Sequence, residues 1–133
     1  MNPNQQSRLE EIESGVGLTL PSAYVAFLHS NVASARHGRI STADGNDWDV
    51  RRMFELGIGP DSSQLDRVYK IVGDVLPTKA IPIAEDSAGN LFLLDCQTGQ
   101  VAWWDHEREL GDDKTEPVAQ SFDEFLTRIE TDD

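Results

Sequence analysis

The stretch from Ala80 to Glu107 constrains the fold more than any other part of the chain. It reads AIPIAEDSAGNLFLLDCQTGQVAWWDHE and contains three short apolar runs separated by turn residues. The run Leu91–Leu94 is too short for a helix and has turn residues on both sides, which indicates a buried strand. Connections as short as these join antiparallel strands. The stretch therefore predicts a three-stranded meander at the heart of the core.

The middle run of this meander is apolar on both of its faces. Apolar residues occupy every position from Leu91 to Leu94, whereas a sheet with one solvated face shows polar residues at alternate positions. We therefore expect this strand to be central and covered on both sides. In the following run, Trp103 and Trp104 point to opposite faces. We expect one indole in the core and the other partly exposed to a partner.

Apolar residues recur at helical spacing in four segments outside the meander. In each segment they fall on one helical face, which is typical of a helix packed against a larger core. The apolar positions are Leu9, Ile12 and Val16; Tyr24, Phe27 and Leu28; Leu65, Val68, Tyr69 and Val72; and Phe122, Phe125, Leu126 and Ile129.

Capping residues mark where several of these helices begin. Ser7 with Glu10, and Ser121 with Glu124, match the capping-box spacing. Pro21 suits the first turn of the second helix, because its missing N–H would be unpaired there in any residue. The first, second and last helices are therefore expected to start near these positions.

Two further strands are expected before the third helix. Gly38–Ile40 begins one, Trp48–Met53 forms the other, and Asp44–Asp47 between them is a turn signal. The turn carries oxygen-bearing side chains but lacks the EF-hand spacing and its closing glutamate, so we assign no metal to it. Asp61 or Ser62 is expected to cap the helix that follows.

Together these elements predict an α+β fold. Its centre is a mostly antiparallel, twisted sheet with the meander at its heart, and N-terminal helices, an intervening helix and a C-terminal helix pack on it. We expect one domain over residues 1–133, with residues 1–7 and 131–133 frayed. Neither a secretory pattern nor an apolar run of about 20 residues occurs. Cys96 is the only cysteine, so we expect a cytoplasmic protein without a disulfide.

Acidic residues dominate the charge of the chain. It carries 24 acidic and 11 basic residues, a net charge of -13, and residues 105–133 alone hold 11 of the acids and three of the bases. Such a field repels nucleic acid and anionic lipid and attracts a basic protein surface. The same charge also favours solubility. We expect no direct nucleic-acid binding and no membrane association.

Three motifs, in this order, resemble the SUKH superfamily. Leu20–Leu28 (LPSAYVAFL) is similar to the family's LPxxYxxFL helix, and Ser121–Leu126 (SFDEFL) is similar to its closing SFxxFL helix. The superfamily comprises immunity proteins of bacterial polymorphic-toxin systems and a fungal cell-wall-assembly regulator. Between the two helices, the matching meander residues are Ile81, Pro82, Glu85, Asp86, Gly89, Asn90, Asp95, Gly99, Val101, Trp104, Asp105, His106 and Glu107.

The resemblance implies a non-catalytic immunity protein that binds and neutralises a cognate toxin, often a nuclease in this family. The alternative is a regulatory interaction scaffold similar to the fungal member. A toxin that grips a phosphate backbone has a basic groove, which an acidic surface with an aromatic anchor can fill. We expect a monomer, or a weak homodimer paired through an uncovered edge strand. The candidate partner-binding residues are Glu85, Asp86, Trp104 as the anchor, Asp105, Glu107, Glu109, Asp112 and Asp113.

The same acidic residues also suggest an enzyme, which the sequence disfavours. Glu85 or Asp86 could serve as a general base, and His106 with Asp105 and Asp86 could ligate a metal. However, the chain has no HExxH, CxxC, P-loop or GxSxG pattern, and its three histidines lie in separate segments. Acids beside tight turns commonly accept bonds from local backbone amides. We expect no catalysis, cofactor or metal, and we expect Asp86 to brace the turn before Gly89.

Overall fold

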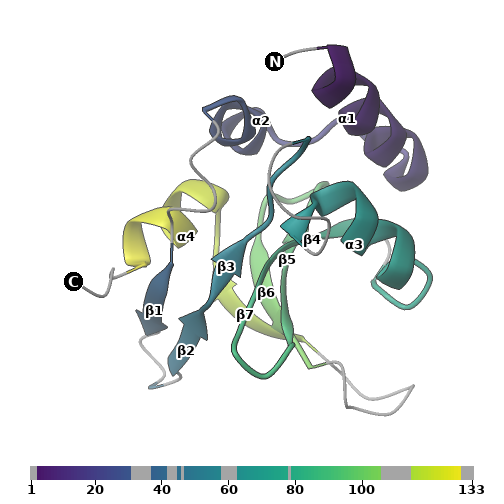
Figure 1. Ribbon diagram of the computed structural model, residues 1–133. Helices are drawn as coiled ribbons and strands as arrows, with labels where there is room; N and C mark the ends of the chain where they lie inside the picture. The colour runs from purple at the N-terminus through teal and green to yellow at the C-terminus, as the bar shows by residue number, and fades with distance from the viewer. Residues whose placement is uncertain are drawn as a thin grey trace.

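The computed structural model describes residues 3–30, 37–41, 45, 47–57, 63–77, 79–105 and 115–129. Helices pack on a five-stranded antiparallel sheet, and a two-stranded sheet lies beside it (Figure 1). This arrangement confirms the predicted α+β class. The bounds of the large sheet are β3 (Arg52–Met53), β4 (Ala80–Glu85), β5 (Leu91–Asp95), β6 (Val101–Trp104) and β7 (Thr115–Ala119), in the order β3-β4-β5-β6-β7.

The predicted meander is the centre of this sheet. Strands β4, β5 and β6 follow one another along the chain and pair antiparallel. In the middle strand, Leu94 pairs with Ile81 on one side and with Val101 on the other. The residues from Leu91 to Leu94 are all buried, with exposed fractions between 0% and 5%. The central strand is therefore covered on both faces, as its uninterrupted apolar run predicts.

The two-stranded sheet consists of β1 (Gly38–Ser41) and β2 (Asp47–Val50), which pair antiparallel. The expectation of a single strand from Trp48 to Met53 is wrong, because the chain changes partner at Arg51. Residues before Arg51 pair with β1, whereas its own N–H donates to the Glu85 carbonyl at 2.9 Å and β3 pairs with β4. As a result, the end of β2 lies next to the end of β4.

The helices join the core through the predicted apolar faces. Helices α1 and α3 contact each other and α3 contacts β4, whereas α4 contacts β7, β1 and α2 (Figure 1). In the described part of the chain, no helix combines the length and the apolar composition needed to cross a bilayer. The bounds are α1 (Pro3–Val16), α2 (Ser22–His29), α3 (Leu65–Val72) and α4 (Phe122–Arg128).

Helix α1 begins earlier than the sequence suggests. It starts at Pro3, within the segment that was expected to fray, and Ser7 lies inside the helix instead of capping it. Gln5 is only 3% exposed, and its Nε2 donates to the Leu56 carbonyl at 2.8 Å. A tertiary contact therefore holds the first turn, which local signals alone leave unsupported.

Helix α4 has the predicted cap and closes the core. Ser121 Oγ accepts from the Glu124 N–H at 3.1 Å, and Glu124 Oε2 accepts in return from the Gln120 N–H at 2.8 Å. In a capping box the glutamate accepts from the N–H of the N-cap residue itself, here Ser121, whereas Glu124 accepts from the N–H of the preceding residue, Gln120. Phe125 is fully buried, with its ring centroid 5.5 Å from that of Phe92 in β5. The last helix is therefore part of the core.

Candidate functional site

The turn between β4 and β5 is built around the carboxylate of Asp86. Its Oδ1 accepts from the backbone N–H groups of Ala88 at 2.9 Å and Asn90 at 2.8 Å. Its Oδ2 accepts from Asn90 Nδ2 at 3.2 Å and from the indole Nε1 of Trp103 at 2.9 Å. Gly89 adopts a positive φ of 86°, which residues with a side chain rarely adopt. Asp86 therefore braces the turn before Gly89, as predicted.

These contacts correct one part of the expected partner surface. Asp86 is 6% exposed, and four donors occupy its two oxygens. A buried carboxylate whose acceptor positions are filled stabilises its neighbours but cannot reach a partner. Asp86 consequently positions the turn and the Trp103 ring, and is not itself a contact residue.

One tryptophan of β6 is buried and the other is accessible, and the buried one is the residue that was expected to be the anchor. Trp104 is 4% exposed and belongs to the core, so its expected role as a surface anchor is wrong. Trp103 is partly exposed, donates its N–H to Asp86, and lies with its ring centroid 6.0 Å from that of Trp48 in β2. The strand alternation predicted opposite faces, and the structure assigns the accessible indole to Trp103.

Strand β2 adds a residue that the sequence analysis missed. Asp49 Oδ2 accepts from the backbone N–H of Ser87 at 3.0 Å and also from the Ser87 hydroxyl. This contact exists because β2, which precedes the change of partner at Arg51, lies beyond the end of β4. Asp49 alternates with Trp48 and Val50 along the strand, which indicated only that it points away from the core.

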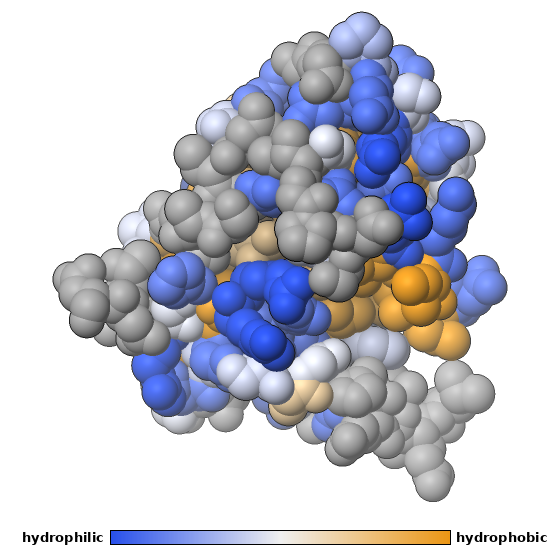
Figure 2. All heavy atoms as spheres, viewed as in Figure 1, coloured by the Kyte–Doolittle hydropathy of each residue, from blue (hydrophilic) through white to orange (hydrophobic). Residues whose placement is uncertain are grey.

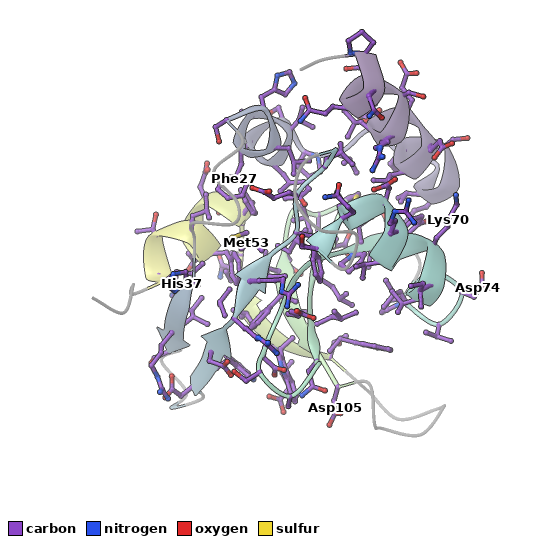
Figure 3. The ribbon with its side chains drawn as sticks, in the orientation of Figure 1. Phe27, His37, Met53, Lys70, Asp74 and Asp105 are labelled. Carbon is purple, nitrogen blue, oxygen red and sulfur yellow. The ribbon has the colours of Figure 1, made fainter. Side chains whose placement is uncertain are left out.

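The remaining predicted contact residues follow from the sheet register. Glu85, Leu91 and Trp104 lie side by side across β4, β5 and β6, so the residues after Glu85 and after Trp104 leave the sheet at the same end. Glu85 pairs with Arg52, with Oε1 and Nε 2.7 Å apart. Asp105 is partly exposed at that end (Figure 3). The predicted residues His106, Glu107, Glu109, Asp112 and Asp113 lie outside the described residues.

We call Asp49, Glu85, Ser87, Trp103 and Asp105 the turn surface. Asp86 holds two of these elements together, because it bonds both the turn and the indole of Trp103. The local charge is negative. The turn surface and Asp86 together carry four carboxylates, whereas the neighbouring residues Arg51 and Arg52 carry two positive charges. The arrangement suits recognition by a fixed aromatic edge within an acidic rim.

Two observations on the described residues concern metal binding and the reactivity of the cysteine. Among them, no group of three His, Cys, Asp or Glu side chains is placed to hold a metal ion. Burial, with smaller contributions from Asp95 and Glu13, raises the pKa of the Cys96 thiol to about 12. This thiol is therefore protonated at neutral pH and is a poor nucleophile.

One protein family and one curated relative match the sequence of this chain. A curated relative is the SPbeta prophage-derived uncharacterized protein YokK of Bacillus subtilis (strain 168). It is 28% identical over an alignment 144 residues long, and the alignment covers 95% of this chain and 73% of the relative. No solved structure matches the chain significantly. The model of the SMI1 / KNR4 family (SUKH-1) matches residues 3–128, which span α1 through α4 and the whole meander. The chain therefore belongs to the SMI1 / KNR4 family (SUKH-1).

Proposed function

We propose that this chain is a non-catalytic immunity protein that binds a cognate toxin domain and neutralises it by direct contact. The observation that carries the proposal is the family match over residues 3–128. Immunity proteins of polymorphic-toxin systems are one of the two kinds of protein in the superfamily that the motifs resemble. The prophage origin of the relative also fits a gene pair carried on a mobile element.

The turn surface is the contact region that we propose for this role. Trp103 supplies a large amphipathic side chain, a residue type that often dominates binding energy when a partner buries it. Its N–H bond to Asp86 and its contact with the tilted ring of Trp48, 6.0 Å away between centroids, order the ring before binding. A ring that is already ordered loses less conformational entropy when the complex forms. This ordering favours Trp103 as the anchor.

The charge of the turn surface favours a basic partner. Glu85 and Asp105 lie at one end of the sheet, and the chain as a whole carries a net charge of -13. A toxin domain that holds nucleic acid presents lysine and arginine in its groove, and an acidic surface complements such a groove. Glu107, Glu109, Asp112 and Asp113 follow Asp105 in sequence, and we propose that they extend this rim.

A survival assay tests the immunity role. The carboxy-terminal domain of the protein encoded beside this chain is produced in a host cell, with and without this chain. An immunity protein restores growth, and the Trp103→Ala variant restores it less well. Growth arrest that the wild-type chain does not relieve would contradict the proposal.

A regulatory scaffold is the second candidate, because the family is also that of a fungal regulator. The two functions predict different phenotypes for a strain that lacks both this gene and the neighbouring toxin gene. Deleting this gene together with its neighbour leaves cells unaffected if the chain is an immunity protein. A growth or morphology defect in the double deletion would favour a scaffold with a constitutive host partner.

A further inference from the structure

The hydrogen-bonding group of the Trp103 ring is already used inside the protein. The indole Nε1 donates to Asp86 Oδ2 at 2.9 Å, and Asp86 is itself only 6% exposed. An indole has no second donor and no acceptor of the ordinary kind. The ring is nevertheless partly exposed. Its accessible part can therefore offer a partner only its carbon atoms and its π electrons.

The bond to Asp86 also makes the face of this ring a better site for a cation. An aromatic ring has a negative face, and tryptophan attracts cations over its face more strongly than tyrosine or phenylalanine does. An N–H group that donates to a carboxylate is polarised by it, which raises the electron density of the ring. Trp48, which is only 9% exposed, contacts the ring at a tilt of 32° and helps to hold it in one orientation.

No cation from the described chain occupies the ring. Over the described ranges, the polar and ring contacts of the Trp103 side chain are those with Asp86 and Trp48, and no lysine or arginine is among them. Arg52 is paired with Glu85, with Nε and Oε1 2.7 Å apart. The ring is therefore available to a cation from another molecule.

The carboxylate of Asp49 can hold the edge of such a cation. Asp49 is partly exposed and follows Trp48 in β2, and its Oδ2 accepts both bonds from Ser87. Among the described residues, no hydrogen bond ends on its Oδ1. A guanidinium group is planar, stacks on aromatic faces and donates from its edge to carboxylates, whereas an ammonium group is a compact and more strongly hydrated charge. The combination of ring and carboxylate therefore suits arginine.

The surroundings of the ring disfavour an apolar occupant. Figure 2 shows mainly blue and white atoms over the end of the molecule where β2 and the β4–β5 turn lie, whereas the orange atoms of this view gather near α3. The local charge at the turn surface is also negative. An apolar side chain would desolvate these carboxylates without compensation, whereas a cation is attracted to them.

We propose that Trp103 receives an arginine side chain of the toxin domain, which stacks on the indole and donates to Asp49. The proposal rests on the immunity role and deepens it, because it names the chemical group that the turn surface binds. Arginine binds phosphate through the same fork of donors that binds a carboxylate. An arginine held at Trp103 is therefore no longer available to the phosphate backbone of a nucleic acid.

The test lowers the electron density of the ring and keeps its shape. Tetrafluorotryptophan is placed at position 103 of the full chain, and the Kd for the catalytically inactivated toxin domain encoded beside it is measured by calorimetry. The fluorinated ring keeps the N–H that bonds Asp86. We expect the Kd to rise by about tenfold, because the attraction of a cation to the ring is weakened. The matched control is the same replacement of Trp104, which is 4% exposed and should leave the Kd unchanged.

A second series identifies the arginine. Arginines of the toxin domain are replaced one at a time by lysine, and each variant is titrated with the wild type and with the protein fluorinated at position 103. We expect one replacement to weaken binding to the wild type by about tenfold and to have much less effect on the fluorinated protein, because both changes remove the same contact. Thermal unfolding checks that all of these proteins are folded.

Each other outcome overturns a defined part of the proposal. If the wild type binds tightly and the protein fluorinated at position 103 binds equally well or better, the ring holds no cation and the immunity role stands. If every arginine replacement affects the two proteins equally, the occupant is not an arginine. If the wild type does not bind at all, the proposed function fails, and with it the occupant named here.

Discussion

Asp86 shows how a single buried side chain organises one end of the sheet. Its carboxylate accepts two backbone bonds from its own turn, one from Asn90 Nδ2, and one from the Trp103 indole in a different strand. Charge-assisted bonds of this kind compensate the burial of a carboxylate, since each oxygen is matched to donors. The conformation of the turn and the position of the indole therefore depend on the same residue.

Asp86→Asn is expected to destabilise the protein by about 1–3 kcal/mol. Asparagine keeps the shape but replaces one acceptor oxygen with an NH₂ donor, which would then face N–H donors in a buried site. Urea denaturation measures the loss. Asp74→Asn removes the same charge at an exposed position and should have little effect. Equal stability of Asp86→Asn and wild type would contradict the bracing role.

Unlike Asp86, Tyr24 is a buried polar residue from which removal of the polar group should not destabilise the protein. The residue is fully buried, and its hydroxyl has no hydrogen-bond partner among the described residues. Tyr24→Phe removes the desolvated hydroxyl and breaks no described bond, so stability should stay equal or rise by about 1 kcal/mol. Thermal unfolding measures this difference. A clear loss of stability would show that the hydroxyl is bonded in solution.

The thiol of Cys96 predicts a loss of stability at high pH. Burial raises its pKa from 9.0 to about 12 in the folded protein. The unfolded chain therefore releases this proton first, so the stabilising contribution is complete below pH 9 and is lost as the pH rises towards 12. In the Cys96→Ala variant, the free energy of unfolding should depend less on pH between about pH 9 and about pH 12. Alkylation of the native thiol should also be slow at pH 8, and rapid alkylation there would contradict the raised pKa.

At the scale of elements, the core was predictable wherever local signals agree with the tertiary fold. The meander follows from short apolar runs and tight turns, and α4 follows from its capping box and its apolar face. The change of partner at Arg51 was not predictable, because it depends on the relative positions of β1 and β4, which are far apart in sequence. The early start of α1 likewise depends on the bond from Gln5 to Leu56, 51 residues away.

The contact surface was harder to predict than the fold for a related reason. Alternation places Trp103 and Trp104 on opposite faces, but it does not say which face the helices cover. The core takes Trp104, so the accessible indole is Trp103. Asp49 reaches the turn at Ser87 only because β2 runs past the end of β4. Both outcomes depend on packing between segments far apart in sequence.

Phe125→Ala tests the docking of α4. The ring is fully buried against Phe92 and lies near Phe122, so its removal leaves a cavity in the core. The expected loss is about 3–5 kcal/mol in the free energy of unfolding. Leu126→Ala, at the partly exposed neighbouring position, should cost clearly less. Equal losses from the two variants would mean that α4 is docked differently.

At the scale of the whole molecule, the fold separates stability from recognition. The meander and its helices supply the core, whereas the exposed part of the turn surface lies outside it. The net charge of -13 attracts a basic partner and opposes a second copy of the chain. Binding to such a partner should weaken as salt screens the charges.

The most direct test of the immunity role is a calorimetric titration of the wild-type chain with the inactivated toxin domain encoded beside it. The titration is made at about 50 mM and about 300 mM salt, and the higher salt shortens the screening length by a factor of about 2.5. We predict tight binding at low salt and a Kd about tenfold higher at high salt. Tight binding without a salt effect would keep the immunity role and move the main contact to the aromatic ring of Trp103. The absence of binding at both salt concentrations would contradict the account.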